Sequence, residues 1–333
     1  MNRPLFKYHP NIGHTFIPNL KTRVMHEYGG YLIKVNQAGF RSNREFEPVK
    51  KPGVFRILLF GDSFTAADGV SNAKRYSDVL EILLPGLEVY NFGLPGSGTD
   101  QQYLIFQEIV EVMDHDLLLI SVSVENIRRI RARYKVYQSH DGKRTIYPKP
   151  YFSLASDGSF QRHHFPVPKG PLSKNQLPPH ERHYVEEGGR FNWLYRTLGK
   201  FDFRAIDFAQ RISRYQPLPA YDSPQNPDWL LMKTILTKWV AESRKPTVIC
   251  PIPVHQYVEQ TANSEACQAR FRELGETLEA KIHDPLPDYW KRSKAERRLL
   301  RFQRDPHPSP AGHRLLAESL APYISDYMDR RID

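Results

Sequence analysis

The sequence predicts an α/β fold in which a parallel β-sheet lies between two layers of helices. Two observations predict this fold. Short apolar runs that are typical of buried strands alternate along the chain with segments whose apolar residues recur at helical spacing. The chain also has 333 residues, of which 40% are hydrophobic, and this is enough to bury the core of one large domain or two ordinary ones.

The predicted strands are short segments filled with apolar, β-favouring residues. They are residues 55–60 (FRILLF), 87–93 (LEVYNFG), 116–124 (DLLLISVSV), 247–254 (TVICPIPV) and a shorter segment near 281–286 (KIHDPL). Helices are predicted at 75–84, at 101–113 with Asp100 as the N-cap, at 264–281, and from near Pro310 onward. Strands and helices that alternate in this way form a parallel sheet with both faces covered.

The chain is predicted to contain a core domain with an insertion. The core is expected from 54–130 and 240–333, with a large insertion or lid at 131–239 between the third and fourth strands. The insertion is rich in Pro, Tyr, His and Arg, and helical pieces are expected near 191–215. Residues 1–53 are expected to pack on the core as a turn-rich lead-in, in which GGYLIKVN can form a strand of a hairpin.

Small and polar residues follow three of the predicted strands. The first strand ends at Gly61-Asp62-Ser63, the second at Asn91-Phe92-Gly93, and the third at Glu125-Asn126. Because functional groups gather at the carboxyl ends of parallel strands, we expect a serine, a glycine and an asparagine at one edge of the sheet. Ser63 is expected to stand exposed at the start of the next helix, with its backbone N–H directed at developing negative charge.

A base for this serine is predicted near the end of the chain. A serine hydroxyl is a weak nucleophile until a base takes its proton, and the base is usually a histidine held by an acceptor. The chain has 13 histidines, and the segment DPHPSPAGHRLLAE narrows the choice to His307. Asp305 lies two positions earlier, so in an extended loop its carboxylate can reach the His307 ring.

Acyl transfer also needs hydrogen-bond donors for the oxyanion. The backbone N–H groups of Ser63 and Gly93 are predicted donors, since Gly93 has no Cβ to block a close approach. Asn126 can add its side-chain amide. Asp62 is interpreted as a turn-forming residue, and Asp68 as structural.

With these residues in place, the chain resembles the SGNH, or GDSL, hydrolase family. The resemblance rests on Gly61-Asp62-Ser63-Phe64, on NFGLPGSGTD around Gly93 and on DPHPSPAGHRLLAE, and it covers the sheet elements of 55–126 and 247–325. The lead-in NQAGFRSNREF also resembles the segment before the nucleophile in bacterial members. The resemblance implies a flavodoxin-like three-layer α/β/α sandwich with about five parallel strands.

The same resemblance implies roles for individual residues. Ser63 becomes the nucleophile, His307 the general base and Asp305 the residue that orients it, while Ser63, Gly93 and Asn126 form the oxyanion hole. The chain departs from the family pattern at two points. The third block reads Val124-Glu125-Asn126-Ile127 where Gly-x-Asn-Asp is common, and the last pair is spaced Asp-x-His where Asp-x-x-His is common.

The expected function is a serine-dependent acyl-ester hydrolase that works through an acyl-enzyme intermediate. The expected substrate is an O-acetylated carbohydrate or polysaccharide, since the aromatic insertion can stack on sugar rings. Two alternatives remain open. One is an O-acyltransferase that uses the same three residues, and the other is a non-catalytic binding protein that keeps the fold.

Charge gives a hint about the substrate. The net charge of +10 is unevenly spread, with dense basic stretches at residues 128–135 (RRIRARYK) and 291–304 (KRSKAERRLLRFQR). Most such runs are solvated helix faces, and a nucleic-acid partner is not expected. Arg128 and Arg129 follow Asn126 directly, and we expect them to attract an anionic group of the substrate. His255, just after the fourth strand, is expected to line the same pocket.

Other protein classes are disfavoured by composition. No apolar run reaches the ~18 residues of a membrane-spanning helix, and the N-terminus lacks a continuous apolar signal, so a cytoplasmic location is expected. Cys250 and Cys267 are expected to be free thiols, and with no CxxC or clustered Cys/His spacing neither a metal nor a cofactor is expected. The oligomeric state is left open.

Overall fold

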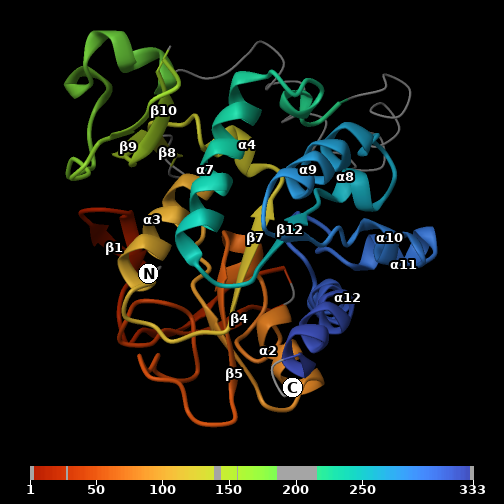
Figure 1. The fold of residues 1–333 in the computed structure, drawn as a ribbon. Coiled ribbons are helices and arrows are strands. Elements are labelled where there is room, and N and C mark those ends of the chain that lie inside the picture. The colour runs from red at the N-terminus through yellow and green to blue at the C-terminus, as the bar shows by residue number, and fades with distance from the viewer. Residues whose placement is uncertain (1–3, 28, 139–143, 156, 186–215, 331–333) are drawn as a thin grey trace.

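The computed structural model describes residues 4–27, 29–138, 144–155, 157–185 and 216–330 of the chain (Figure 1). Its centre is a five-stranded parallel sheet with the strand order β13-β12-β7-β5-β6. The strands are β5 (Phe55–Phe60), β6 (Leu87–Asn91), β7 (Leu117–Ser123), β12 (Thr247–Ile252) and β13 (Lys281–Ile282). The predicted α/β fold is therefore confirmed. The chain passes from β5 to β6 on one side and then crosses to β7 on the other side of β5. In sheets of this kind the ligand-binding site lies at such a switch point, at the carboxyl ends of the strands.

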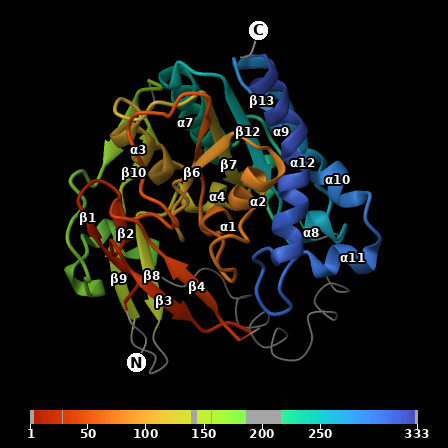
Figure 2. The ribbon, with the colours of Figure 1, turned by 90° about the horizontal axis from the view of Figure 1, so that it is seen from below.

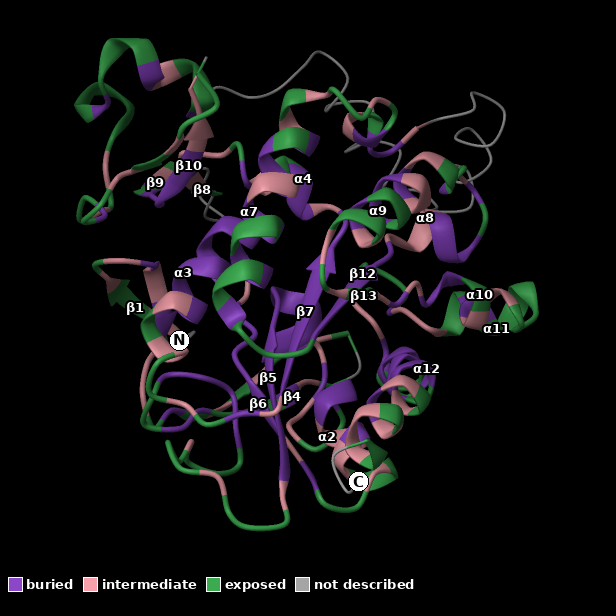
Figure 3. Cartoon of the chain, in the orientation of Figure 1, coloured by how far each residue is buried: buried purple, intermediate pink, exposed green. Residues whose placement is uncertain are grey.

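Helices cover both faces of the sheet. One layer is formed by α2 (Tyr76–Leu83) and α12 (Pro310–Asp329), and the other by α3 (Thr99–Ile109), α7 (Pro227–Ser243) and α9 (Glu265–Thr277) (Figure 1). Successive residues of β5 alternate between the layers, because strand side chains point to opposite faces. Ile57 and Leu59 pack with α2 and α12, whereas Leu58 and Phe60 pack with the other layer. All residues of the four longer strands but Glu88 are buried, as Figure 3 shows for most of the sheet.

The predicted N-cap of α3 is wrong. The helix begins at Thr99, its N-cap is Gly98, and Asp100 lies inside the first turn. Asp100 has other partners, because its Oδ2 accepts a hydrogen bond from Lys149 Nζ at 2.5 Å and its Oδ1 accepts one from Gln101 N at 2.9 Å. The lysine comes from the insertion, so spacing along the chain gave no sign of it.

The lead-in forms two antiparallel hairpins, and the predicted strand within GGYLIKVN is confirmed as β4. The first hairpin pairs β1 (Phe6–His9) with β2 (Gly13–Phe16), and the second pairs β3 (Lys21–Val24) with β4 (Tyr31–Lys34). Figure 2 shows both hairpins on the same side of the molecule as β8 and β9 of the insertion.

The described part of the insertion before α7 lies beyond the carboxyl ends of the strands (Figure 1). It contains the hairpins β8 (Tyr134–Gln138) with β9 (Arg144–Pro148) and β10 (Tyr151–Leu154) with β11 (Phe160–His163). It also contains the 3-10 helices η1 (Lys174–Gln176), η2 (Pro179–Val185) and η3 (Pro219–Tyr221). The helical pieces predicted near 191–215 lie outside the described residues. Helix α7 packs on the sheet and crosses the predicted domain boundary at residue 240.

Short helices complete the carboxyl edge of the sheet. They are α1 (Ser63–Ala66), α4 (Asn126–Arg129), α8 (His255–Val258), α10 (Leu286–Trp290) and α11 (Lys294–Leu299). In the part of the chain that the structure describes, no helix combines the length and the apolar character needed to cross a bilayer. Cys250 and Cys267 are both buried and free, as predicted.

Candidate active site

The turn after β5 is built around Gly61. A Cβ at this position would stand 2.0 Å from Thr65 Oγ1, so only glycine fits between the strand and α1. Asp62 then caps α1, because its Oδ1 accepts a hydrogen bond from Phe64 N at 2.9 Å. This agrees with the interpretation of Asp62 as a turn-forming residue. The turn places Ser63 at the first position of α1.

The lead-in holds this turn from behind through Arg41. Its guanidinium is fully buried and donates to the carbonyl oxygens of Ala66, Ala67 and Val70, each at 2.7 Å. Backbone carbonyls at the end of a helix need partners, and an arginine from another segment supplies them here. Residues 1–53 are therefore part of what positions the serine.

The structure brings together the three residues predicted for the nucleophile and its base. Ser63 Oγ lies 2.7 Å from His307 Nε2, although the residues are 244 positions apart. His307 Nδ1 contacts Asp305 Oδ1, and the backbone N–H of His307 donates to the same oxygen at 2.9 Å. With Nδ1–H donating to Asp305, Nε2 of His307 is the acceptor for the Ser63 hydroxyl proton. A base oriented by a carboxylate is the arrangement that activates a serine.

Ser63 differs from expectation in its exposure. It was expected to stand exposed, but only 4% of its surface is accessible. The reason is that His307 lies over its hydroxyl group, and the Phe64 ring packs against His307 with the ring centres 4.9 Å apart.

His26 is a site residue that the sequence analysis missed. Its Nε2 lies 3.2 Å from Asp305 Oδ2, so the carboxylate is held by a histidine on each side. The His26 ring also packs edge-on against Phe302, with the ring centres 4.4 Å apart. His26 and Asp305 are 279 positions apart, and no spacing in the sequence connects them.

The charges around His307 favour its protonated form. Burial lowers the pKa of His307, but the hydrogen bond to Asp305 and the nearby carboxylates of Asp68 and Asp62 raise it, and the net effect is a pKa above the ordinary value of a histidine. Burial raises the pKa of Asp305, but its bonds to His307 and His26 outweigh this, so the pKa of Asp305 lies well below its usual range. Asp68, interpreted as structural, thus acts on the proposed base through its charge.

The structure distinguishes the predicted backbone donors. Ser63 N–H has no acceptor among the described residues, so it is free to bind an oxyanion. Gly93 N–H already donates to Asn91 Oδ1 at 2.8 Å, so its predicted role as a donor is not supported by the geometry. Glycine is needed at position 93 for packing, because a Cβ there would stand 2.4 Å from Ala66 N.

Gly96, three residues further on, is a better candidate than Gly93. In the described part of the chain its N–H has no acceptor, and its φ of 68° lies in the left-handed region that favours glycine. The loop that carries it is bonded to the nucleophile turn, since Leu94 N donates to Gly61 O at 3.0 Å. Gly96 was missed in the sequence analysis because a glycine was sought directly at the end of a strand. Whether a backbone N–H is free to donate depends on the turn that follows the strand.

Asn126 lies three residues after the end of β7, the neighbour of β5 in the sheet. It is fully buried, and neither Nδ2 nor Oδ1 has a hydrogen-bond partner among the described residues. A buried amide without a partner costs about 1–3 kcal/mol, so its presence needs an explanation. A substrate oxygen that binds Nδ2 would supply one.

Arg129, which was predicted to attract an anionic group of the substrate, is paired with a buried carboxylate in the structure. Its Nη1 lies 2.8 Å from Asp62 Oδ2, and the Asp62 side chain is only 1% exposed. Burial raises the pKa of Asp62 and Arg129 counters this shift, so the arginine compensates a buried charge directly beside Ser63. Arg128 remains half exposed, where it lies 3.6 Å from Glu125 and donates to the carbonyl oxygen of Pro217.

His255 lies near the three site residues. It lines a small recess together with Phe64 and with Pro306 and Pro308, which flank His307. Burial and the charge of Arg301 lower the pKa of His255 to about 4, so it is neutral at pH 7. Its role in substrate binding stays a prediction.

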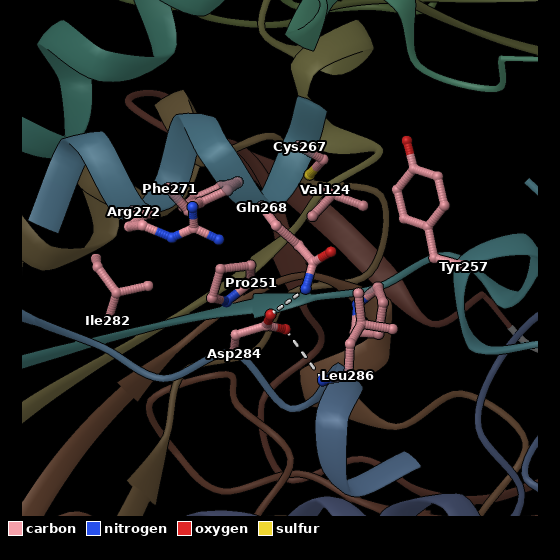
Figure 4. Close-up of a pocket in the computed structure, with 11 residues that line it drawn as sticks. Val124, Pro251, Tyr257, Cys267, Gln268, Phe271, Arg272, Ile282, Asp284 and Leu286 are labelled. Carbon is pink, nitrogen blue, oxygen red and sulfur yellow. Dashed lines mark hydrogen bonds between the residues drawn. The ribbon is translucent and has the colours of Figure 1, made fainter. Parts of the chain in front are cut away.

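A separate cavity of about 210 Å³ lies between α9 and the carboxyl ends of β12 and β13 (Figure 4). It is lined mainly by apolar side chains, and Asp284 within it is satisfied, because Gln268 Nε2 donates at 2.6 Å and Leu286 N at 3.0 Å. None of the residues predicted for the site lines this cavity.

A second serine contacts a histidine elsewhere in the fold, but it lacks the same chemistry. Ser319 Oγ lies 2.8 Å from His283 Nε2 and donates its proton to Asp288 Oδ2 at 2.6 Å. Because the hydroxyl proton goes to the carboxylate, His283 is the donor in the other contact and cannot act as a base toward Ser319. Among the described residues, no group of three His, Cys, Asp or Glu side chains could hold a metal ion.

The comparisons with known proteins show a distant likeness. No protein-family model and no curated protein matches the sequence. The structure is similar over most of the chain to a member of the lipolytic protein G-D-S-L family from Veillonella parvula, with 10% identity, a TM-score of 0.43 and coverage of 82% of this chain and 99% of that one. For the lipase/acylhydrolase from Enterococcus faecalis the identity is 12%, the TM-score 0.44 and the coverage 82% and 96%. The acetyl xylan esterase AlAXEase is 12% identical, with a TM-score of 0.44 and coverage of 81% of this chain and 100% of that one. Such scores are too low to assign an activity.

Proposed function

We propose that the protein is a serine-dependent carboxylic ester hydrolase. One observation carries this proposal, namely the contact of 2.7 Å between Ser63 Oγ and a histidine whose other ring nitrogen is held by Asp305. Unpartnered donors at Ser63 N and Asn126 Nδ2 support it, since acyl transfer needs both a nucleophile and an oxyanion site.

The proposed reaction has two steps. Ser63 Oγ attacks the carbonyl carbon of the ester while its proton passes to His307 Nε2, and the negative oxygen binds the free donors. The bond to the alcohol then breaks, and His307 returns the proton to the leaving oxygen, which leaves an acyl group on Ser63. Water attacks this acyl-enzyme, gives its proton to His307, and releases the acid as the proton returns to Ser63.

The substrate we propose is an O-acetylated carbohydrate. Tyr137 and Tyr147 on the β8–β9 hairpin are 50% and 38% exposed, and their rings meet edge to face with the centres 5.6 Å apart. Exposed aromatic rings of this kind can stack on the apolar face of a sugar, and the hairpin lies to one side beyond the carboxyl ends of the strands (Figure 1).

The proposal is tested by acetate release from 4-nitrophenyl acetate and from a panel of acetylated oligosaccharides. We expect steady release into water. If 4-nitrophenol is released only when a sugar acceptor is added, and the acetyl group appears on that sugar, the protein is a transferase. If neither product forms with any ester, the hydrolase proposal fails and a binding role is favoured.

The pH dependence follows from the pKa of His307, which must be neutral to act as a base. Activity should therefore fall as the pH drops through the pKa of His307, which lies above the ordinary value of a histidine. Asp68 contributes to this raised pKa, so Asp68→Asn should move the acidic limb of kcat/KM to lower pH while the plateau changes little. If the acidic limb of the kcat/KM profile has the same midpoint in Asp68→Asn as in the unmodified protein, Asp68 does not act on His307.

His26 should act as a positioning residue through Asp305. His26→Phe removes a hydrogen bond to a charged group, and we expect kcat to fall about tenfold with KM nearly unchanged. His26→Gln retains a donor and should restore most of the rate. Equal losses in both variants would indicate a packing role against Phe302 instead.

A further inference from the structure

Lys135 of β8 places its ammonium group over the glycine loop of the proposed site. Its Nζ lies 3.2 Å from where a Cβ on Gly96 would stand. This loop is bonded to the nucleophile turn through Leu94 N and Gly61 O, and Gly96 carries one of the free N–H groups. Lys135 as a whole residue is intermediate in exposure.

The charges around Lys135 do not balance. Two neighbouring cations have carboxylate partners, because Arg129 pairs with Asp62 at 2.8 Å and Lys149 pairs with Asp100 at 2.5 Å. Lys135 forms no ion pair with a carboxylate in the described part of the chain, and the nearby Asp100, whose charge acts on Lys135, is already paired with Lys149. When Lys135 is protonated, its positive charge at this place has no negative charge of its own to balance it.

The only described side chain within hydrogen-bond distance of Lys135 Nζ is His14, whose ring nitrogens both lie 3.3 Å away. Burial and the charge of Lys135 lower the pKa of His14 to about 3, so its ring is neutral and offers no negative charge. His14 Nε2 also lies 2.9 Å from the carbonyl oxygen of Pro95, to which it donates. The imidazole thus holds the lysine in place without neutralising it.

Other members of the basic run 128–135 are engaged elsewhere. Arg131 lies 3.1 Å from Asp228, and Arg133 lies 2.7 Å from Glu181 and also covers the rings of Tyr151 and Tyr184. A charged group that is partly removed from water is costly unless it is paired. Burial, Lys149 and Arg129 accordingly lower the pKa of Lys135 well below its ordinary value.

We propose that Lys135 forms a subsite for an anionic group, a carboxylate or a phosphate, on the substrate of the adjacent Ser63. The inference rests on the proposed function and deepens it. Because an acetyl group has no place for a further charge, the anionic group belongs to the alcohol part of the ester. An acetylated sugar acid or sugar phosphate has this chemistry, and it would complete the ion pair that the chain leaves open.

The test measures binding without turnover, in a Ser63→Ala background. Calorimetry compares 4-acetoxybenzoate with its neutral methyl ester, and 4-acetoxyphenyl phosphate shows whether a carboxylate or a phosphate is preferred. We expect an anionic ester to bind about ten- to hundredfold more tightly than the neutral one, and Lys135→Gln to abolish the difference. Arg131→Met is the matched control from the same basic run and should retain the preference.

Two results would overturn the subsite. One is equal affinity for charged and neutral esters, and the other is a preference that survives Lys135→Gln. A loss of kcat/KM by the same factor for both kinds of ester in Lys135→Gln would also overturn it, since it would place the lysine at the oxyanion. Failure of the hydrolase proposal is seen separately, as absence of turnover of all three esters by the unmodified protein.

Discussion

Ser63→Ala is expected to lower ester hydrolysis by about 10⁴-fold or more while the protein stays folded. The change removes the atom that we propose forms the acyl-enzyme, and His307 then has no hydroxyl proton to accept at 2.7 Å. The loss should appear in kcat, with little change in the affinity for esters. Steady-state kinetics with 4-nitrophenyl acetate measures the loss, and circular dichroism checks the fold.

Ser319→Ala is a matched control, because the Ser319 hydroxyl also contacts a histidine, at 2.8 Å from His283 Nε2. Its proton goes to Asp288, so its removal should leave kcat close to that of the unmodified protein. Equal activity of Ser63→Ala and the unmodified protein would exclude Ser63 as the nucleophile.

Arg129→Met is expected to destabilise the protein by about 3 kcal/mol. The change leaves the buried Asp62 carboxylate without its arginine partner, which lowers the free energy of unfolding. Asp62 lies beside Ser63 and caps α1, so the loss falls on the turn that carries the serine. Chemical denaturation measures the free energy of unfolding. Combining the change with Asp62→Asn should recover part of the loss, since the buried charge is then gone.

Arg128→Met is the control from the next position along the chain. The side chain of Arg128 is 53% exposed, and its partner Glu125 is 38% exposed. Surface pairs of this kind contribute little, so we expect a change within about 0.5 kcal/mol. Equal destabilisation by the two variants would show that the contact between Arg129 and Asp62 does not carry the difference.

The sheet could be predicted from the sequence because its strands are buried on both faces. Continuous apolar runs such as FRILLF mark strands of this kind, and the polar residues after them mark the carboxyl edge. The contact between Asp305 and His307 follows from their short spacing in a loop. The approach of Ser63 to His307 could be expected only because the motif resemblance joined both ends of the chain.

What the sequence could not predict depends on partners that are distant along the chain. Arg129 was expected to attract an anionic group, and nothing in the sequence indicated that its guanidinium pairs with the buried Asp62. Asp100 was expected to cap α3, but Lys149 from the insertion pairs with its carboxylate. Whether Gly93 or Gly96 offers a free N–H depends on the geometry of the turn after β6. The contact between His26 and Asp305 joins two segments 279 positions apart, and no motif in the sequence links them.

The most direct test of the proposed chemistry is intact-mass analysis after reaction with a fluorophosphonate. We expect one covalent adduct, mapped by peptide sequencing to Ser63 and absent from Ser63→Ala. Its rate of formation should fall with Asp305→Asn, because His307 then loses the carboxylate that orients it. A protein that stays unlabelled, or an adduct on another residue, would contradict the account.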